Sequence, residues 1–221
     1  MNIIFLGAPG SGKGTQALML ANKLEITAVS TGEVLRKEVL QKSDIGKFAK
    51  SFMDSGKLVP DEVVIDIIKK QIVEAHHGRG FILDGFPRNT AQAVKLDEML
   101  LSIGKKIDIV FNFEVSEDVL VKRILGRFSC KGCGEIYNRY FKLPKKDGVC
   151  NKCESIEFEN RKDDTEETIN NRLKVYHEST FPLIDYYKKN NLLFSIGAVE
   201  SPALVFEALV EATYKTFQNK Y

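Results

Sequence analysis

The chain opens on a short apolar run, Asn2-Ile3-Ile4-Phe5-Leu6, that leads directly into Gly7-Ala8-Pro9-Gly10-Ser11-Gly12-Lys13-Gly14-Thr15. Glycines let the backbone turn tightly and point successive N–H groups at an anion. The next residues predict a helix, because their apolar positions share one face: Ala17, Leu20, Ala21 and Leu24. A strand, a glycine-rich loop with a lysine and a helix in this order indicate a P-loop rather than an ordinary turn. We therefore expect the loop N–H groups, the helix N-terminus and Lys13 to bind a polyphosphate.

One position departs from the usual P-loop pattern. A Ser or Thr normally follows the lysine and ligates Mg²⁺ through its hydroxyl, whereas this chain has Gly14 there. The hydroxyl is therefore either moved to Thr15 or absent. Asp84, at the end of an apolar run, is predicted to organise Mg²⁺ through its waters, as a Walker-B acid does. The alternative for Asp84 is a helix N-cap.

The order of apolar runs along the chain predicts the fold class. Strand-like runs occur at 3–6, 26–30, 81–84, 107–113 and 192–196, with amphipathic helical patterns between them. This alternation predicts an α/β fold, with a parallel five-stranded sheet and helices on both faces. Two insertions interrupt a core formed by 1–30, 61–125 and 165–221. The first, 31–60, reads as helical with Gly46 and Gly56 as breakers, and the second, 126–164, contains every cysteine.

Size and charge exclude several classes of protein. With 221 residues and 43% hydrophobic content, the chain suits one domain with insertions. Lys and Arg number 32 against 30 Asp and Glu, a balance that disfavours a non-specific nucleic-acid binder. We find no apolar run of membrane-spanning length and no signal-peptide pattern. These features predict a cytoplasmic protein with neither membrane nor nucleic-acid partners.

The cysteines form two C-x₂-C pairs, Cys130-Lys131-Gly132-Cys133 and Cys150-Asn151-Lys152-Cys153, separated by sixteen residues. This spacing is typical of four thiolates around a tetrahedral Zn²⁺ in a zinc ribbon, although Fe could replace it. Four sulfur ligands leave no position open, so the metal is predicted to be structural. Disulfides and a redox pair are the alternatives. A nucleic-acid-binding ribbon is another, but we expect its aromatic residues, Tyr137, Tyr140 and Phe141, to form the small core of the hairpin.

Arginines recur in the segments around the insertions. Their rigid guanidinium groups suit phosphate oxygens and keep their charge. Taken singly, each could instead be a solvated residue or half of an ion pair with Asp163, Asp164, Glu166 or Glu167. The residues concerned are Arg36, Arg88, Arg123, Arg127, Arg161 and Arg172.

Taken together, these motifs resemble the adenylate kinase family, in its long-lid, zinc-binding bacterial form, over essentially the whole chain. They are the Gly-x-Pro-Gly-x-Gly-Lys-Gly-Thr loop ending at Thr15, Ser30-Thr31-Gly32 with Arg36, Asp84-Gly85-Phe86-Pro87-Arg88 with Gln92, Arg123 before Gly126-Arg127, and Arg161-Lys162-Asp163-Asp164 with Arg172. This chain departs from the family pattern at Phe128, where many members have a second arginine after the Gly-Arg pair. Lid closure here is expected to make one charged contact fewer.

The resemblance implies roles for individual residues. Residues 31–60 become an AMP-binding insertion, and 126–164 become a lid over ATP. ATP would be held by Gly10, Ser11, Gly12, Lys13, Gly14, Thr15, Arg123 and Arg127. AMP would be held by Thr31, Arg36, Lys57, Leu58, Val59, Gly85, Phe86, Pro87, Arg88, Gln92, Arg161 and Arg172. The catalytic residues would be Lys13, Arg88, Arg123, Arg127, Arg161 and Arg172, and the stretch Ser195-Ile196-Gly197-Ala198 would pass near the ATP base.

The implied activity is reversible, Mg²⁺-dependent phosphoryl transfer from ATP to AMP, giving two ADP, by a monomer. The AMP phosphate is already ionised, so no general base is needed, and we expect no catalytic role for His76, His77 or His177. A pyrimidine nucleoside monophosphate kinase is the alternative within the same class. Its lid usually lacks cysteines, so the cysteine segment disfavours it.

Overall fold

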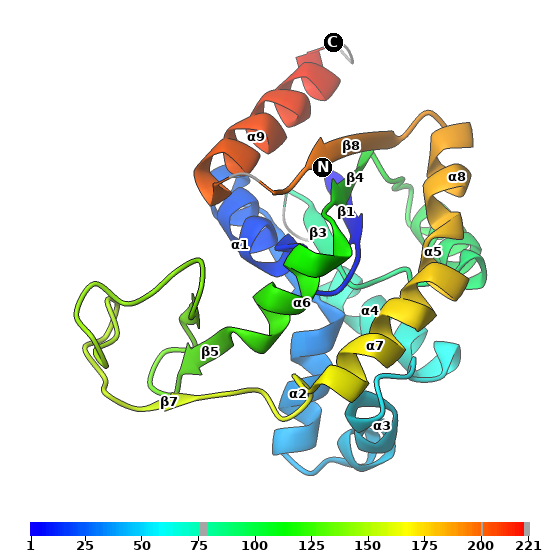
Figure 1. Ribbon diagram of the computed structural model, residues 1–221. Helices are drawn as coiled ribbons and strands as arrows, with labels where there is room; N and C mark the ends of the chain where they lie inside the picture. Colours follow the sequence, from blue (N-terminus) through cyan, green and yellow to red (C-terminus); the bar gives the residue numbers. More distant parts are fainter. Residues whose placement is uncertain (76–78, 200, 219–221) are drawn as a thin grey trace.

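A computed structural model describes residues 1–75, 79–199 and 201–218 of the chain (Figure 1). Its central sheet has five parallel strands in the order β2-β3-β1-β4-β8. The strands are β1 (Asn2–Gly7), β2 (Thr27–Ser30), β3 (Phe81–Asp84), β4 (Ile109–Glu114) and β8 (Leu193–Gly197). The predicted α/β class and parallel five-stranded sheet are therefore confirmed.

Alternate residues of the strands bury against opposite layers of helices. Ile4 and Leu6 face one apolar core, whereas Ile3 and Phe5 face the other. This follows from the two-residue period of a strand, and it explains why the strands read as continuous apolar runs. One layer contains α1 (Lys13–Leu24) and α9 (Pro202–Gln218). The other contains α2 (Thr31–Leu40), α3 (Asp44–Asp54), α4 (Asp61–Ala75), α5 (Thr90–Ser102) and α8 (Pro182–Lys189).

Two further helices carry the chain into and out of the cysteine insertion. They are α6 (Glu117–Leu125) and α7 (Glu166–Val175), and α7 continues through the π-helical turn η1 (Tyr176–Thr180). Leu120 and Ile124 of α6 pack against Ile169 and Leu173 of α7 in a separate small core. None of the helices in the described ranges has the length and apolar composition needed to cross a membrane.

Several predicted boundaries need correction. The second, fourth and fifth strands begin at Thr27, Ile109 and Leu193, one or two residues later than the apolar runs, because pairing with the neighbouring strand starts there. Gly56, with φ 71°, does follow the end of α3. The prediction that Gly46 breaks a helix is wrong.

Gly46 lies inside α3, where it permits close packing on α2. A Cβ at this position would lie 2.1 Å from the carbonyl oxygen of Glu38. The helical turn is retained because Ser43 caps it, its side chain accepting a hydrogen bond from the Gly46 N–H at 3.0 Å. The glycine therefore serves contact between helices rather than a break in one.

The lid segment, 126–164, folds as a small antiparallel sheet of order β6-β5-β7 that stands apart from the central sheet (Figure 1). Its strands are β5 (Arg127–Cys130), β6 (Ile136–Asn138) and β7 (Phe158–Glu159). Phe128, Tyr137 and Phe158 form its aromatic core, with ring centroids 5.4–5.7 Å apart. Of the three aromatic residues expected in that core, Tyr137 is buried, but Tyr140 and Phe141 are 66% and 55% exposed.

Candidate functional site

The loop between β1 and α1 is built so that Lys13 folds back over it. The Lys13 ammonium donates hydrogen bonds to the carbonyl oxygens of Gly7 and Ala8, at 2.7 and 2.8 Å, and to Ser11 Oγ at 3.1 Å. Gly10 has φ 84°, and a Cβ there would lie 2.7 Å from Ile124 of α6. Only glycine combines this backbone conformation with such close packing. The loop is therefore held tightly between the sheet and α6.

Asp84 lies at the carboxyl end of β3, beside the start of α1. Its Oδ2 accepts a hydrogen bond from Ser30 Oγ at 3.4 Å, and a Cβ on Gly14 would lie 3.2 Å from the same atom. A Ser or Thr at position 14 would therefore press against the carboxylate. The N-cap alternative for Asp84 is not supported, because Asn89 caps α5, the helix that follows. Its position and donor chemistry fit a cation held at the phosphates.

Five arginines converge in the structure, two of them, Arg88 and Arg172, close enough to lower the pKa of Lys13, and we call the five the arginine cluster. The structure brings together α2, the loop after β3, the two ends of the lid segment, and α7. The members are Arg36, Arg88, Arg127, Arg161 and Arg172. Such a convergence of guanidinium groups is suited to several phosphate groups held close together.

Burial and repulsion between neighbouring positive charges lower the pKa values of this cluster. Burial is the main cause that lowers the pKa of Arg88 to about 10, and the nearby charges of Arg172 and Arg36 add to it. Burial and Arg127 likewise lower the pKa of Arg161 to about 10. The pKa of Lys13 falls to about 8, mostly through burial, while Asp84 opposes the shift. The site thus holds more positive charge than its own acids neutralise.

Three carboxylates hold the cluster in place. Asp164 receives two hydrogen bonds from Arg127, at 2.8 and 2.6 Å, and Asp163 receives one from Arg172 at 2.8 Å. The two aspartates had been considered as ion-pair partners, and they do pair. Glu166 and Glu167, considered with them, lie instead in the first turn of α7. Arginine pairing lowers the pKa of Asp163, although burial alone would raise it.

Glu33 is the third carboxylate, and its role was not predicted from the sequence. Its Oε1 accepts hydrogen bonds from Arg36 and Arg161, both at 2.6 Å. The contact to Arg36 spans three residues of α2, a spacing that could have been read from the sequence. The contact to Arg161 spans 128 residues and joins α2 to the end of the lid segment. Glu33 is therefore a bridge between the two insertions.

The residues expected to hold AMP lie around α2 and the loop after β3. Thr31 is buried, and among the described residues neither Thr31 Oγ1 nor Arg36 Nε has a hydrogen-bond partner. Such orphaned polar atoms indicate a place for a polar ligand. Gly85, Phe86 and Pro87 form the loop after β3, with a cis peptide bond before the proline. Gln92 is buried in α5, and in the loop before α4 Lys57 is exposed, Leu58 half-buried and Val59 in the core.

Arg123 lies apart from the arginine cluster, at the end of α6. Its guanidinium carbon sits 5.6 Å from the ring centroid of Phe141, and Nη1 donates to the Ser11 carbonyl at 3.5 Å. Phe141 is thus placed beside the P-loop by the lid segment, a contact that the sequence did not reveal. Ser195, in β8, accepts a hydrogen bond from Asn112 of β4 at 3.3 Å.

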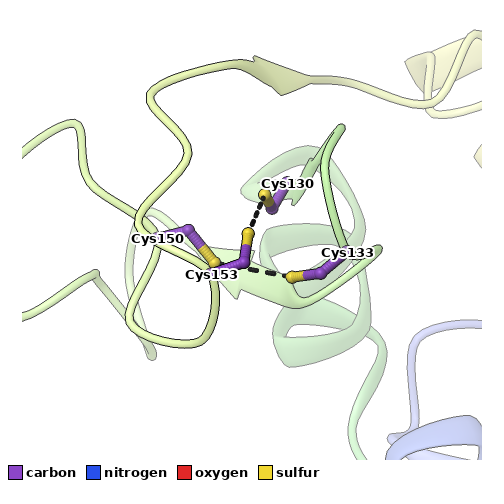
Figure 2. A group of neighbouring side chains, drawn as sticks. All are labelled: Cys130, Cys133, Cys150 and Cys153. Carbon is purple, nitrogen blue, oxygen red and sulfur yellow. Dashed lines mark hydrogen bonds between the residues drawn. The ribbon is translucent and has the colours of Figure 1, made fainter.

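The four cysteines of the lid segment point toward one another (Figure 2). Their sulfur atoms all lie within 4.8 Å of one another, with Cys130–Cys153 and Cys133–Cys150 at 3.5 and 3.6 Å. The sulfurs of a tetrahedral site with Zn–S bonds of about 2.3 Å are roughly 3.8 Å apart, so the donor set fits zinc. The cysteines are not bridged by disulfides.

Tyr137 supports the cysteine cluster from the aromatic core. Its hydroxyl donates to Cys150 Sγ at 3.4 Å and accepts from the Asn151 N–H at 2.7 Å. Burial alone would raise the pKa of Cys150, but the hydrogen bonds from Tyr137 and from nearby backbone N–H groups lower it to about 6. A thiolate is the form that binds metal. Phe128 stacks on Tyr137 and so belongs to the aromatic core of the lid segment.

The histidines are not part of this arrangement as far as the structure describes them. His177 contacts Glu117 of α6 at 2.8 Å and is exposed. His76 and His77 lie outside the described residues.

Comparison with known proteins places this geometry in context. The family model for adenylate kinase matches residues 5–192. An adenylate kinase from Streptomyces avermitilis is 48% identical over 221 residues, covering 100% of both chains. One from Archaeoglobus fulgidus is 48% identical over 214 residues, 96% of this chain and 98% of that relative. One from Thermodesulfovibrio yellowstonii is 47% identical over 209 residues, 95% of this chain and 97% of that relative.

Proposed function

The chain belongs to the adenylate kinase family, whose reaction turns ATP and AMP into two ADP, and from this premise we propose how its residues carry that reaction out. We propose that transfer requires Mg²⁺, that the lid segment closes over ATP, and that zinc stabilises the lid segment. The observation that carries the proposal is the convergence of Lys13 and the arginine cluster from separate parts of the chain.

The P-loop and Lys13 would bind the ATP phosphates. The Lys13 ammonium now donates to loop carbonyls and to a hydroxyl. Phosphate oxygens are stronger acceptors, because a hydrogen bond between two charged groups is about twice as strong as a neutral one. The remaining ATP-binding roles go to Gly10, Ser11, Gly12, Gly14, Thr15, Arg123 and Arg127. Phe141, which stacks on Arg123, lies at the edge of this group.

The arginine cluster would neutralise the transferring group. Phosphoryl transfer spreads negative charge over three equatorial oxygens, so positioned cations lower the barrier and no general base is needed. The carboxylates of Glu33, Asp163 and Asp164 form ion pairs with arginines of the cluster. We propose that nucleotide phosphates replace part of these contacts and so assemble Arg88, Arg127, Arg161 and Arg172 around the phosphoryl group.

The acceptor nucleotide would be held by the 31–60 insertion and the loop after β3. Thr31 Oγ1 and Arg36 Nε supply buried polar atoms that a phosphate or sugar could satisfy. The other AMP-binding residues of the proposal are Lys57, Leu58, Val59, Gly85, Phe86, Pro87 and Gln92. Asp84 would hold Mg²⁺ through water, and the ion supplies charge neutralisation at the ATP phosphates when bound.

Closure of the two insertions over the core, 1–30, 61–125 and 165–221, would exclude water, which otherwise hydrolyses ATP. Cys130, Cys133, Cys150 and Cys153 would hold one Zn²⁺ that ties the lid segment together, so that it moves as a unit. Its own core is small, with Tyr137 the largest buried side chain. Elemental analysis should find one zinc per chain. Removing the zinc with a chelator should lower the melting temperature clearly, whereas most of the activity measured at low temperature should remain.

The proposal is tested by an acceptor assay. Protein, MgATP and each of AMP, GMP, CMP and UMP are mixed, and nucleoside diphosphates are separated by chromatography. We expect AMP to be the preferred acceptor, and faster use of CMP or UMP would overturn the assignment. Lys13→Ala should lower kcat by about 10³-fold or more, whereas Lys23→Ala, on the exposed face of α1, should not change it.

A further inference from the structure

A hydrogen-bond network joins the start of α4 to the start of α5, around the buried side chain of Gln92. Gln92 Nε2 donates to Asp61 Oδ1 at 2.7 Å, and Gln92 Oε1 accepts from the Arg88 N–H at 2.7 Å. Asn89 Nδ2 donates to both oxygens of the same Asp61 carboxylate, at 3.0 and 3.1 Å. The Gln92 side chain is therefore held by one acceptor and one donor on different elements.

These partners fix which way the Gln92 amide points. A carboxylate has only acceptor atoms, so it must meet the NH₂ group. A backbone N–H can only donate, so it must meet the carbonyl oxygen. A flipped amide would set oxygen against Asp61 and NH₂ against the Arg88 N–H, and both hydrogen bonds would be lost. At 2% exposure, Gln92 could not recover them from water.

The backbone around Gln92 is held as well. Asn89 caps α5, its Oδ1 accepting from the Gln92 N–H at 2.8 Å. The Arg88 carbonyl accepts a hydrogen bond from Thr180 Oγ1 at 2.8 Å, and Arg88 Nε donates to the Gly85 carbonyl at 2.9 Å. The donor that meets Gln92 Oε1 is consequently fixed from two sides. The amide is oriented by rigid partners.

The amide retains capacity for a ligand. An amide NH₂ has two hydrogens and its oxygen has two lone pairs, and within the described residues the network uses one of each. One donor and one acceptor therefore remain on the amide. They match adenine, which offers an amino donor at position 6 next to a ring acceptor at N1 or N7. A 6-oxo purine has an acceptor at position 6 and a donor at N1, which suits only the flipped amide.

We propose that Asp61 is a positioning residue for base specificity: by fixing the Gln92 amide, it makes the acceptor site read a 6-amino purine and reject a 6-oxo purine. This inference rests on the proposed function, in which Gln92 contacts the acceptor base. Asp61 itself does not contact the substrate. Without its carboxylate the amide can flip, and the site should accept both kinds of purine.

The test measures kcat/KM for AMP and IMP, which differ in the groups at position 6 and N1. The wild type should strongly prefer AMP. In Asp61→Ala the AMP/IMP ratio should fall by roughly 10- to 100-fold, the effect of one or two mismatched buried hydrogen bonds. Most of the loss for AMP should appear in KM. Glu62→Gln, on the exposed side of the same helical turn, is the matched control and should leave the ratio unchanged.

A second variant distinguishes an effect on the orientation of the Gln92 amide from a general loss of folding. In Asp61→Asn/Asn89→Asp the donor and acceptor of the 61–89 contact are exchanged, so the residue at 61 can still accept from Gln92, while Asp remains a good N-cap at 89. This double variant should regain most of the AMP/IMP ratio that Asp61→Asn loses. Equal losses for AMP and IMP in Asp61→Ala and Asp61→Asn, or an unchanged ratio in both, would overturn the inference. A wild type that does not phosphorylate AMP would instead overturn the proposed function.

Discussion

The lowered pKa of Lys13 predicts that nucleotide binding weakens in mildly alkaline solution. Burial beneath its own loop, together with Arg88 and Arg172, lowers this pKa from the ordinary value of 10.5 to about 8, although Asp84 opposes the shift. Binding of phosphate requires the ammonium form. Above pH 8, Lys13 of the nucleotide-free protein is mostly deprotonated. Binding must then be accompanied by proton uptake at Lys13, and the free energy of that uptake weakens the affinity.

The size of the effect follows from the pKa. With the ammonium form required and a pKa near 8, binding should be about 10-fold weaker at pH 9 and about 30-fold weaker at pH 9.5 than at pH 7. The nucleotide does not contribute to this change, because a phosphate loses its last proton near pH 6. Arg88 and Arg161 have pKa values of about 10, so their loss of charge should make the affinity fall more steeply only above pH 9.5.

The assay is calorimetric titration with ADP, without magnesium, from pH 6.5 to 10. Lys13→Arg is the informative variant, because a guanidinium keeps its charge in this range. Its affinity is expected to be lower at pH 7, but it should not fall further between pH 8 and 9.5. A wild-type affinity that stays constant up to pH 10, or the same decline in Lys13→Arg, would refute the reasoning.

Three further predictions concern stability and metal binding. Gly46→Ala should lower the free energy of unfolding by about 3 kcal/mol, because its Cβ would overlap the Glu38 carbonyl; urea denaturation measures this. Tyr137→Phe removes the hydrogen bond to Cys150, so a competing chelator should take up zinc about 10-fold more readily. Asp163→Asn should cost about 3 kcal/mol of stability near neutral pH, because it breaks a largely buried ion pair. Arginine pairing lowers the pKa of Asp163 in the folded protein, so this cost should shrink as the pH falls below the ordinary aspartate value of 3.8 and the carboxylate becomes protonated.

The glycine and tyrosine changes each have a matched control variant, and the aspartate change is checked by its pH dependence. Gly197→Ala should be nearly neutral, because among the described residues, its chain neighbours aside, no atom lies within 4 Å of the added Cβ. Tyr140→Phe removes a hydroxyl from an exposed ring and should leave zinc retention unchanged. Equal zinc loss from both tyrosine variants would contradict a role for the Tyr137 hydroxyl. A stability difference for Asp163→Asn that does not shrink as the pH is lowered below 3.8 would contradict the ion-pair explanation.

Much of the fold could be predicted because its signals are local. The apolar runs of the strands and the glycines around Lys13 are each contiguous in the chain, and the runs form a parallel sheet while the glycines lie in the loop before α1, as expected. The errors arose where packing between elements decides. Gly46 reads as a helix breaker, but it is a contact point between α2 and α3. Tyr140 and Phe141 read as core residues, but the three-stranded sheet places them outside.

In the candidate site, too, the residues within local motifs could be predicted and the contacts between distant segments could not. Its cations could be named from motifs, but their partners could not. Glu33 meets Arg161 across 128 residues, and Asp61 meets Gln92 across 31. Neither distance has a periodic signature in the sequence. Each of these segments contains several charged and polar residues, so the sequence allows many alternative ion pairs and hydrogen bonds between them.

The sequence by itself determined the class of fold, the glycine-rich loop around Lys13 and the grouping of the four cysteines, because each depends on the spacing of a few neighbouring residues. The tertiary structure alone decided which carboxylate holds which guanidinium, where the lid aromatics face, and which way the Gln92 amide points. The physical reason is that a hydrogen bond or ion pair depends on the position of atoms to within about half an ångström. Those positions are set only when sheet, helices and insertions have packed together.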